Sequence, residues 1–203
     1  MAKRLLDLTV AAVGLVLLLP LMLSIALVVR LDSAGPSLFR QTRVARGGRL
    51  FEILKFRTMT AATTPNGPLI TVFGDTRITR VGAFLRRSKL DELPQLINVL
   101  KGDMSLVGPR PEVPRYVALY PAEIREIVLS VRPGITDEAA IEFSDESALL
   151  ASATDPERAY VQEILPRKLQ RYVQYARHHS VAGDVHIIAR TLRRLVKQTR
   201  DSV

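Results

Sequence analysis

The chain has no cysteine and no tryptophan, and only 5% of its residues are aromatic. Without cysteine it can form neither a disulfide nor a thiolate metal site. With so few aromatic side chains, the stacking platforms that bind single-stranded nucleic acid are not expected. The three histidines, His178, His179 and His186, do not form the HExxH pattern of zinc hydrolases. These absences argue against disulfides, zinc and single-stranded nucleic acid.

Glycine-rich loops that hold nucleotide phosphates are also missing, because neither GxxxxGK[ST] nor GxGxxG occurs. Positive charge is abundant: 29 Lys and Arg residues against 20 Asp and Glu give a formal net charge of +9. This excess suits an anionic partner, and charge alone leaves nucleic acid, lipid headgroups and a phosphorylated substrate open. The 203 residues suffice for one domain with a hydrophobic core.

Residues 10–29 form one uncharged apolar run, preceded by Lys3 and Arg4 and followed by Arg30. Its length matches the hydrocarbon core of a bilayer, which a helix of about 20 residues crosses. A signal peptide would have a shorter apolar region and a small-residue cleavage site after it, and neither is present. We therefore expect a membrane-inserted helix, with a fully buried helix of a soluble protein as the less favoured alternative.

Pro20 interrupts the middle of this run. An interior proline removes one backbone hydrogen bond and clashes with the preceding turn, so the helix should kink or fold back. Positive residues flank both ends, and the positive-inside rule therefore does not place the ends on opposite sides of the membrane. A kinked single span and a re-entrant helix with both ends on the cytoplasmic face remain open.

The rest of the chain predicts an α+β domain that is mostly helical. Two β-prone runs, residues 38–44 and 50–56, flank Gly47 and Gly48 and predict a β-hairpin. Residues 60–75 contain prolines and glycines without a period, which indicates a loop. Amphipathic spacing and capping residues predict helices over residues 78–87, 89–101 (ending at Gly102), 123–131, 156–179 (capped by Asp155 and interrupted near Pro166) and 181–198.

The last predicted helix carries an apolar stripe formed by Val181, Val185, Ile188, Leu192 and Leu195. Its basic residues lie largely off this stripe: Arg190, Arg193, Arg194 and Lys197. Such a helix suits the interface of an anionic membrane leaflet. A solvated helix packed on the core explains the same pattern equally well.

The adjacent carboxylates Asp91 and Glu92 are the first candidates for chemistry. In the first turn of a helix, where Pro94 also favours their placement, they could simply complement the helix dipole. However, basic residues closely precede them: Arg77, Arg80, Arg86, Arg87 and Lys89. Cations followed by carboxylates suit a diphosphate site, where the cations hold the anion and a carboxylate attacks phosphorus or holds a metal.

Two further segments could bind phosphate. In the first, Pro109 and Pro111 fix the backbone on both sides of Arg110, which suits bidentate phosphate recognition. A rigid connector with an exposed arginine is the alternative. In the second, Lys55 and Arg57 should point to one face of a strand and form a paired cation site, unless they belong to an ordinary polar face.

The order of these motifs resembles the bacterial sugar transferases, the monotopic phosphoglycosyl transferases. The resemblance covers residues 2–136. It rests on KRLLD at residues 3–7, KFRTM at 55–59, DTRITRVG at 75–82, LDELPQ at 90–95, NVLKGDMS at 98–105, VGPRP at 107–111 and RPGIT at 132–136.

This resemblance implies transfer of a phospho-sugar from a UDP-sugar to polyprenyl phosphate, with release of UMP. Asp91 would be the nucleophile that forms an aspartyl phospho-sugar, with Glu92 assisting it. Magnesium would bind near Asp91, and Arg86 and Arg110 would contact the nucleotide substrate. The resemblance also implies a re-entrant membrane helix in residues 1–35 and a catalytic domain in residues 36–203 on the cytoplasmic face of the bacterial inner membrane.

Two positions depart from the family pattern. Leu19 stands before Pro20 where many members have serine, and Asp137 begins an acidic segment, residues 137–147, where many continue with glycine and an aromatic residue. We interpret the second departure as local tuning of sugar specificity. Membrane lipid is an expected partner, nucleic acid is not, and a homo-oligomer is compatible with the sequence.

Two alternatives to this function remain. One is a non-catalytic, membrane-anchored basic protein that binds anionic lipid or nucleic acid. It leaves the joint order of the carboxylate pair and the Pro-Arg-Pro segment unexplained. The other is an enzyme that transfers the sugar alone, which would release UDP in place of UMP.

Overall fold

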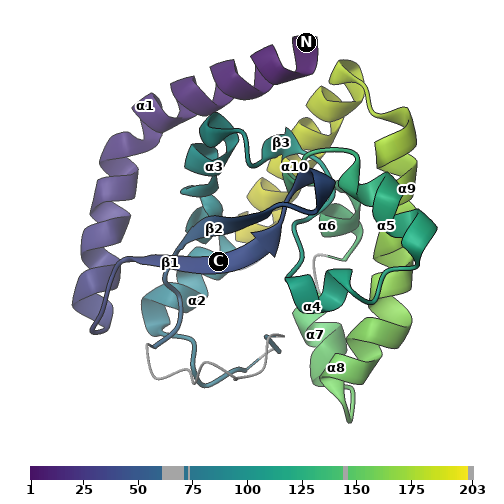
Figure 1. Ribbon diagram of the computed structural model, residues 1–203. Coiled ribbons are helices and arrows are strands. Elements are labelled where there is room, and N and C mark those ends of the chain that lie inside the picture. The colour runs from purple at the N-terminus through teal and green to yellow at the C-terminus, as the bar shows by residue number, and fades with distance from the viewer. Residues whose placement is uncertain (61–70, 73, 144–145, 201–203) are drawn as a thin grey trace.

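The computed structural model describes residues 1–60, 71–72, 74–143 and 146–200 (Figure 1). These residues are mostly helical, with two small sheets, as the α+β prediction required. The long helix α1 arches over the top and down the left side of the molecule in Figure 1, and the β1–β2 hairpin lies between it and α9. The predicted loop at residues 60–75 falls largely outside the described residues.

Helix α1 (Ala2–Asp32) contains the apolar run and is the one helix of the described chain that is long and apolar enough to cross a membrane. It bends in its middle, and Pro20 interrupts its hydrogen bonding there (Figure 1). The hydroxyl of Ser24 donates to the carbonyl of Pro20 at 3.0 Å. Most of its apolar side chains remain exposed, Leu17 by 72% and Leu23 by 63%, which distinguishes α1 from a core helix.

The first turns of α1 are attached to the domain by charged side chains. Asp7, only 2% exposed, accepts hydrogen bonds from the Ser105 hydroxyl at 2.9 Å and the Leu106 amide at 3.0 Å. Lys3 contacts Asp184 at 2.5 Å, and Arg4 donates to the Val99 carbonyl at 2.8 Å. Because these partners belong to the folded domain, the beginning of the apolar helix lies against it.

The hairpin has the predicted form. Strand β1 (Leu38–Val44) pairs antiparallel with β2 (Leu50–Phe56). The turn η1 (Arg46–Gly48) contains Gly47 and Gly48 at φ values of 70° and 80°, a conformation that favours glycine. The hairpin packs with α1 and α3 around Ala11, Phe51, Ile53 and Val99.

Three elements follow the hairpin in the chain: α2, η2 and α3. Helix α2 (Arg80–Arg87) begins at Thr79, whose hydroxyl accepts from the Gly82 amide at 2.9 Å. The expected helix over residues 89–101 is instead a 3₁₀ turn, η2 (Leu90–Glu92), followed by α3 (Gln95–Lys101). Pro94 has no amide hydrogen to donate, and the α-helix begins only after it at Gln95, so the prediction of one continuous helix over residues 89–101 is wrong. Its predicted end at Gly102 is confirmed.

A parallel pair of short strands, β3 (Ser105–Val107) and β4 (Gly134–Thr136), was not expected. Their connection passes through α4 (Pro114–Val117) and α5 (Ala122–Leu129). The backbones approach so closely that a Cβ atom at Gly134 would lie 2.1 Å from the Gly108 nitrogen. This approach brings the residues after β3 and β4 together.

Five further elements pack with α4 and α5 around a second core cluster. They are α6 (Glu138–Glu142), α7 (Glu146–Ala151), α8 (Pro156–Ala159), the π turn η3 (Tyr160–Ile164) and α9 (Leu165–His178). Asp155 caps α8 as predicted, and the expected interruption near Pro166 is the π turn that precedes it. Tyr116, Tyr160 and Tyr172, the last of them on α9, lie in this core.

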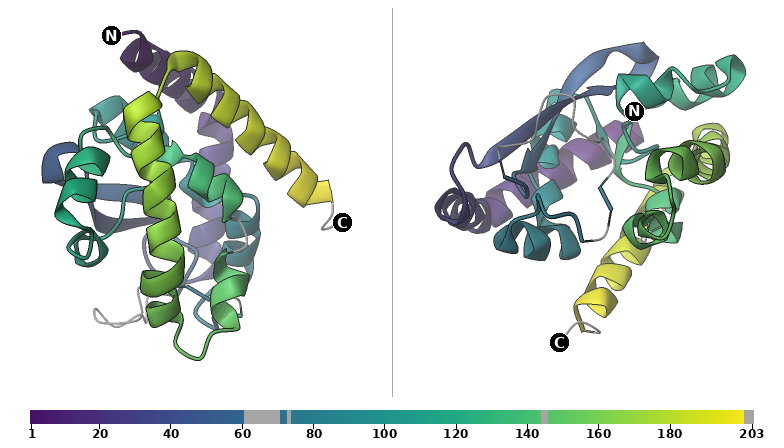
Figure 2. Two further views of the ribbon diagram at one scale, coloured as in Figure 1. Left: turned by 90° about the vertical axis from the view of Figure 1, so that its right-hand side faces the viewer. Right: turned by 90° about the horizontal axis from the view of Figure 1, so that it is seen from below.

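Helix α10 (Val181–Arg200) runs diagonally away from the end of α9 (Figure 2). It contacts the domain through Asp184 and Ile187, which are buried. The predicted apolar stripe instead faces outward in part: Val181, Val185 and Leu192 are exposed. Ile188 of the same stripe packs against the core, so the stripe is divided between the core and the surface.

Candidate active site

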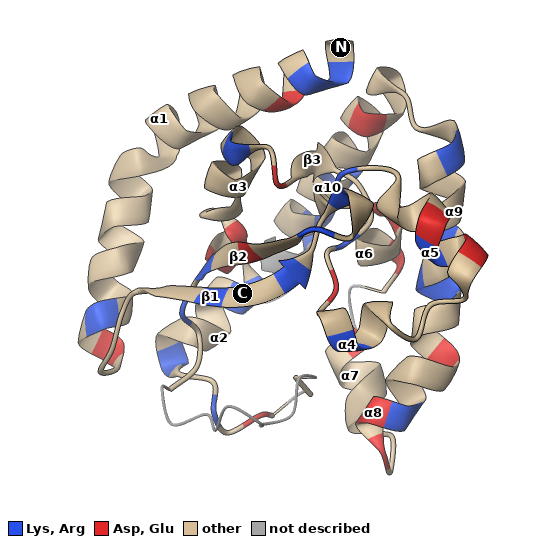
Figure 3. Cartoon of the chain, viewed as in Figure 1, with Lys and Arg blue, Asp and Glu red and all other residues tan. Residues whose placement is uncertain are grey.

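The carboxylate pair lies in the 3₁₀ turn η2, at the meeting point of α2, α3 and the hairpin. Figure 3 shows this acidic turn beside β2, with basic segments on β1, β2 and α2 nearby. Asp91 is only 6% exposed. Its Oδ1 atom is buried and has no hydrogen-bond partner among the described residues.

Glu92, the next residue, is fully engaged by cations. Its Oε1 atom accepts from Lys55 Nζ at 2.7 Å and from Arg110 Nη2 at 2.7 Å. All three side chains are mostly buried, so these are charge-assisted hydrogen bonds in a poorly hydrated setting. The two segments predicted to bind phosphate, one with Lys55 and one with Arg110, thus meet at Glu92.

The two carboxylates have opposite pKa shifts. Burial raises the pKa of Asp91, and the neighbouring charge of Glu92 adds to this, while Lys55 opposes it. Burial also acts to raise the pKa of Glu92, but Arg110 and Lys55 outweigh it and hold that pKa well below its usual value. Glu92 raises the pKa of Arg110 in return. The ionised form of Glu92 is therefore favoured by its two cations, whereas Asp91 keeps one oxygen without a partner among the described residues.

The Pro-Arg-Pro segment is fixed from both sides. The Arg43 guanidinium donates to the Pro111 carbonyl at 2.9 Å and approaches Glu112 at 3.6 Å. On the other side, the Gly134 amide donates to the Pro109 carbonyl at 3.0 Å. The backbone that carries Arg110 is therefore held by β1 and β4, as a preset phosphate-binding arginine requires.

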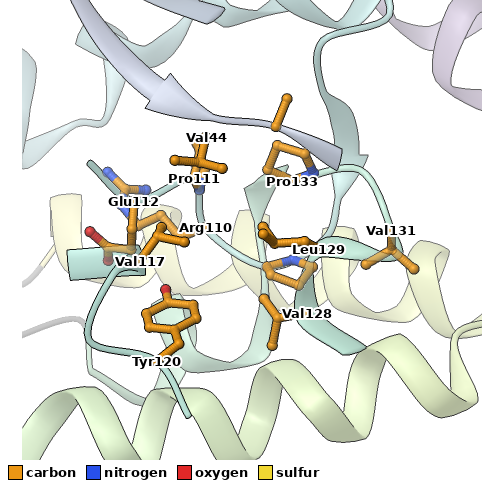
Figure 4. A pocket seen from close by; sticks show the side chains of 12 residues that line it. Val44, Arg110, Pro111, Glu112, Val117, Tyr120, Val128, Leu129, Val131 and Pro133 are labelled. Atoms are coloured by element: carbon orange, nitrogen blue, oxygen red, sulfur yellow. The ribbon is translucent and has the colours of Figure 1, made fainter. Parts of the chain in front are cut away.

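A small cavity of about 10 Å³ lies beside this segment, lined by Arg110, Val44 and Tyr120 among others (Figure 4). Such a volume holds about one water molecule. The cavity is too small to be a substrate pocket.

Arg86 lies on α2 and points toward the segment after β2. Its Nη1 atom approaches the Thr58 hydroxyl at 3.4 Å. Gly82 allows α2 to pack this closely, because a Cβ atom there would lie 2.1 Å from the Thr58 carbonyl oxygen. The positive charge of Arg86 acts to lower the pKa of Asp91, against the larger effect of burial, so Arg86 lies near the carboxylate pair.

The expected paired cation site of Lys55 and Arg57 does not form. Strand β2 ends at Phe56, and the buried Arg57 guanidinium binds the end of α1, donating to the carbonyls of Ser33 at 2.7 Å and of Ala34. Carbonyls at the C-terminal end of a helix lack intrahelical partners and favour a cation. Arg57 therefore attaches the end of the apolar helix to the domain, while Lys55 alone reaches the carboxylate pair.

The residues present fit a magnesium ion. Mg²⁺ usually binds one or two carboxylates together with substrate phosphates and water. The unpartnered Oδ1 of Asp91 can supply one ligand. A cage made only of protein is not formed, since the described residues contain no group of three His, Asp or Glu side chains that could hold a metal.

The sequence did not identify three residues around Arg110 as site residues. Arg43 holds the Pro111 carbonyl, and Asp137 and Tyr172 influence Arg110 electrostatically. Asp137 stood out only as the start of an acidic segment. Arg43 and Tyr172 gave no signal, because they reach Arg110 through pairings between distant parts of the chain.

A family model described as "Bacterial sugar transferase" matches residues 1–198. The chain belongs to this family of enzymes. This sugar transferase is 41% identical over 194 residues to the UDP-glucose:undecaprenyl-phosphate glucose-1-phosphate transferase of Caulobacter vibrioides, a match covering 94% of the chain and 68% of the relative. It is 38% identical over 196 residues to the UDP-N-acetylgalactosamine-undecaprenyl-phosphate N-acetylgalactosaminephosphotransferase of Aeromonas hydrophila, covering 96% of the chain and 43% of that relative.

Proposed function

We propose that this sugar transferase moves a phospho-sugar from a UDP-sugar to polyprenyl phosphate and releases UMP. The observation that carries the proposal is Asp91: a buried carboxylate with an unpartnered oxygen, beside a fixed Lys55–Glu92–Arg110 cluster. The names of the relatives support the substrates, since both describe undecaprenyl phosphate as the acceptor. The reaction would be the first membrane step in assembling a bacterial glycoconjugate.

In the proposed first step, a carboxylate oxygen of Asp91 attacks the β-phosphorus of the UDP-sugar. The bond from this phosphorus to the oxygen that bridges the two phosphates breaks, and UMP leaves with the electron pair. In the second step, a phosphate oxygen of polyprenyl phosphate attacks the same phosphorus. The bond to Asp91 breaks, which restores the free carboxylate.

The surrounding residues have distinct proposed tasks. Arg110, with Arg86 as a second cation, binds the diphosphate, and Pro109 and Pro111 keep Arg110 in place. Lys55 favours the ionised form of Asp91, since its charge opposes the larger effect of burial on the pKa of Asp91. Magnesium bound at Asp91 and the diphosphate would neutralise charge on the leaving phosphate. Glu92 fixes Lys55 and Arg110 and is committed to them.

Product identity tests this function. Purified protein in detergent, given a UDP-sugar, polyprenyl phosphate and Mg²⁺, should release UMP in equal amount to the lipid-linked phospho-sugar. Release of UDP would show that the sugar alone is transferred. Binding of anionic lipid without turnover of any UDP-sugar would favour the non-catalytic alternative.

We further propose that α1 is re-entrant, with both ends on the cytoplasmic side of the inner membrane. Asp7 binds the Ser105 hydroxyl and Leu106 amide at the beginning of the helix, and Arg57 binds its end. Both ends are therefore attached to the same domain, whereas a straight span would separate them by the thickness of a bilayer. UDP-sugars are cytoplasmic, so the domain should be too.

The exposed apolar residues of α10, including Val185 and Leu192, suit contact with lipid at the membrane interface. This contact would hold the domain flat against the leaflet. It would bring Asp91 near the level of the headgroups, where polyprenyl phosphate lies.

Cysteine labelling tests the topology, because the chain has no native cysteine. A cysteine at Ala2 should react only with reagents that reach the cytoplasm. A cysteine at the exposed Ser130 of the catalytic domain is the matched control and should behave identically. If an impermeant reagent labels position 2 but not position 130 in intact cells, α1 spans the membrane and the re-entrant proposal is wrong.

A further inference from the structure

The carboxyl ends of β3 and β4 bring a second polar group next to Arg110. The two strands are parallel, and Val107 pairs with Thr136. The residues that follow them are the Gly-Pro-Arg segment and Asp137, and the Gly108 amide donates to the Thr136 carbonyl at 3.1 Å. In α/β proteins, ligands bind outside the carboxyl ends of parallel strands. Asp137 lies at such an end.

Asp137 is 2% exposed, and its two oxygens differ. Oδ1 accepts from the Ala140 amide at 2.8 Å and caps α6. Oδ2 is buried without a hydrogen-bond partner in the part of the chain that the structure describes. The same is true of the Tyr172 hydroxyl on α9, whose residue is 1% exposed.

Unpartnered polar atoms in a protein interior are costly. Each loses its hydrogen bonds to water, at about 1–3 kcal/mol. More than nine in ten such groups have a partner, so these two require an explanation. Asp137 follows Thr136, whose carbonyl accepts from the Gly108 amide two residues before Arg110, and the charges of Asp137 and Tyr172 both act to raise the pKa of Arg110.

The protonation state of Asp137 suits an acceptor. Burial raises the pKa of Asp137 to about 6, although the Ala140 amide, Arg110 and Lys168 all act to lower it. Above that pH the carboxylate is ionised and can only accept hydrogen bonds. The Tyr172 hydroxyl, whose pKa burial raises well above its usual value, keeps its proton and can donate or accept.

We propose that Asp137 Oδ2 and the Tyr172 hydroxyl form a subsite for carbohydrate hydroxyl groups of the UDP-sugar. The proposal rests on the proposed function, since it places the sugar beside the diphosphate that Arg110 binds. Hydroxyl groups donate to a carboxylate and both donate to and accept from a tyrosine, so the hydroxyls of a sugar can satisfy either atom. The atoms are covered, and a sugar reaches them only after a shift of neighbouring groups, such as the five-residue helix α6.

Two conservative variants test the subsite. Asp137→Asn keeps an oxygen to cap α6 but removes the charge, and Tyr172→Phe removes only the hydroxyl. Tyr116→Phe is the matched control, because Tyr116 is a buried tyrosine of the same core with an unpartnered hydroxyl and is not placed in the site. For each variant, kcat/KM for UMP release is measured with UDP-glucose, UDP-galactose and their N-acetylamino counterparts, and UMP affinity by calorimetry.

We expect Asp137→Asn and Tyr172→Phe to reduce kcat/KM for the preferred sugar by about tenfold or more, the effect of losing a hydrogen bond to a substrate hydroxyl. The ratio of kcat/KM values between sugars that differ at one hydroxyl should decrease, while the UMP affinity of both variants stays at the wild-type level. Tyr116→Phe should match the wild type in both measurements. A loss of UMP affinity would instead identify the ribose as the carbohydrate recognised.

An equal decrease for every sugar with unchanged UMP affinity, or no change at all, would overturn the proposal and leave the two atoms to a buried water molecule. The proposed function survives either result as long as the wild type releases UMP. If the wild type releases no UMP from any UDP-sugar, the function itself fails.

Discussion

Asp91 and Glu92 are adjacent in the sequence, but their carboxylates lie in opposite environments. Glu92 accepts from Lys55 and Arg110 at 2.7 Å each, whereas Asp91 Oδ1 is buried without a partner among the described residues. Glu92 is part of a finished ion-pair cluster, whereas Asp91 Oδ1 still lacks a hydrogen-bond donor among those residues. The comparison supports the proposed division of roles, in which Glu92 holds the two cations and Asp91 is the nucleophile.

The same contrast occurs among the polar groups around Arg110. Its guanidinium forms an ion pair with Glu92. Asp137 Oδ2 and the Tyr172 hydroxyl, whose charges act on the pKa of Arg110, have no partner among the described residues. We propose that a substrate hydroxyl completes the second set.

The largest expected effect on stability comes from breaking the finished cluster. Glu92→Gln leaves Lys55 and Arg110 buried without their shared anion, which should cost about 3–5 kcal/mol of unfolding free energy. UMP release should also fall sharply, because Arg110 loses its orientation. Denaturant unfolding in detergent and the UMP assay measure the two effects.

Glu52→Gln is the control for this variant. Glu52 lies on the same hairpin, but it is 61% exposed and its ion pair with Arg40 is at the surface. Its loss should change the unfolding free energy by less than about 1 kcal/mol. If the two variants are equally stable, the Glu92 cluster does not hold the site together.

A smaller effect on stability is expected from replacing Asp137, a buried carboxylate with one oxygen that has no partner among the described residues. The folded-state pKa of Asp137 is raised to about 6 from 3.8, so folding favours its protonated form and the wild type loses stability as pH rises through this range. Asp137→Asn removes this dependence. Its unfolding free energy relative to wild type should rise by about 2–2.5 kcal/mol between pH 4 and pH 8, at about 1.4 kcal/mol per pKa unit.

Unfolding curves for both proteins across this pH range measure the difference. A constant difference at all pH values would show that the carboxylate is already satisfied in the folded protein. Asp137 would then no longer differ from Glu92 in having an unsatisfied carboxylate.

Local patterns in the sequence predicted the elements that depend on neighbouring residues. The hairpin follows from two β-prone runs around Gly47 and Gly48, and α5 from its amphipathic spacing. The end of α3 follows from Gly102, and the cap of α8 from Asp155. Each of these signals acts within a few residues of the structure it determines.

Features that depend on distant pairing were missed. Strands β3 and β4 have three residues each, too few for a sequence period, and they exist because Gly108 and Gly134 allow their backbones to approach. The left-handed Lys89, which separates the 3₁₀ turn from α2, has no sequence signal. Strand alternation predicts that Arg57 and Lys55 point to the same face, but β2 ends at Phe56, one residue before Arg57. The residues at the end of α1 supply the hydrogen-bond acceptors of Arg57 instead.

The most direct test of the central claim is to identify the residue that carries the phospho-sugar. Protein mixed with UDP-sugar and Mg²⁺, but without polyprenyl phosphate, should release up to one UMP per chain. Mass spectrometry should then find the phospho-sugar mass on the peptide that contains Asp91, and polyprenyl phosphate should remove it. Asp91→Asn should fold, form no adduct and release no UMP. An adduct on another residue, or substantial turnover by Asp91→Asn, would contradict the assignment of Asp91 as the nucleophile.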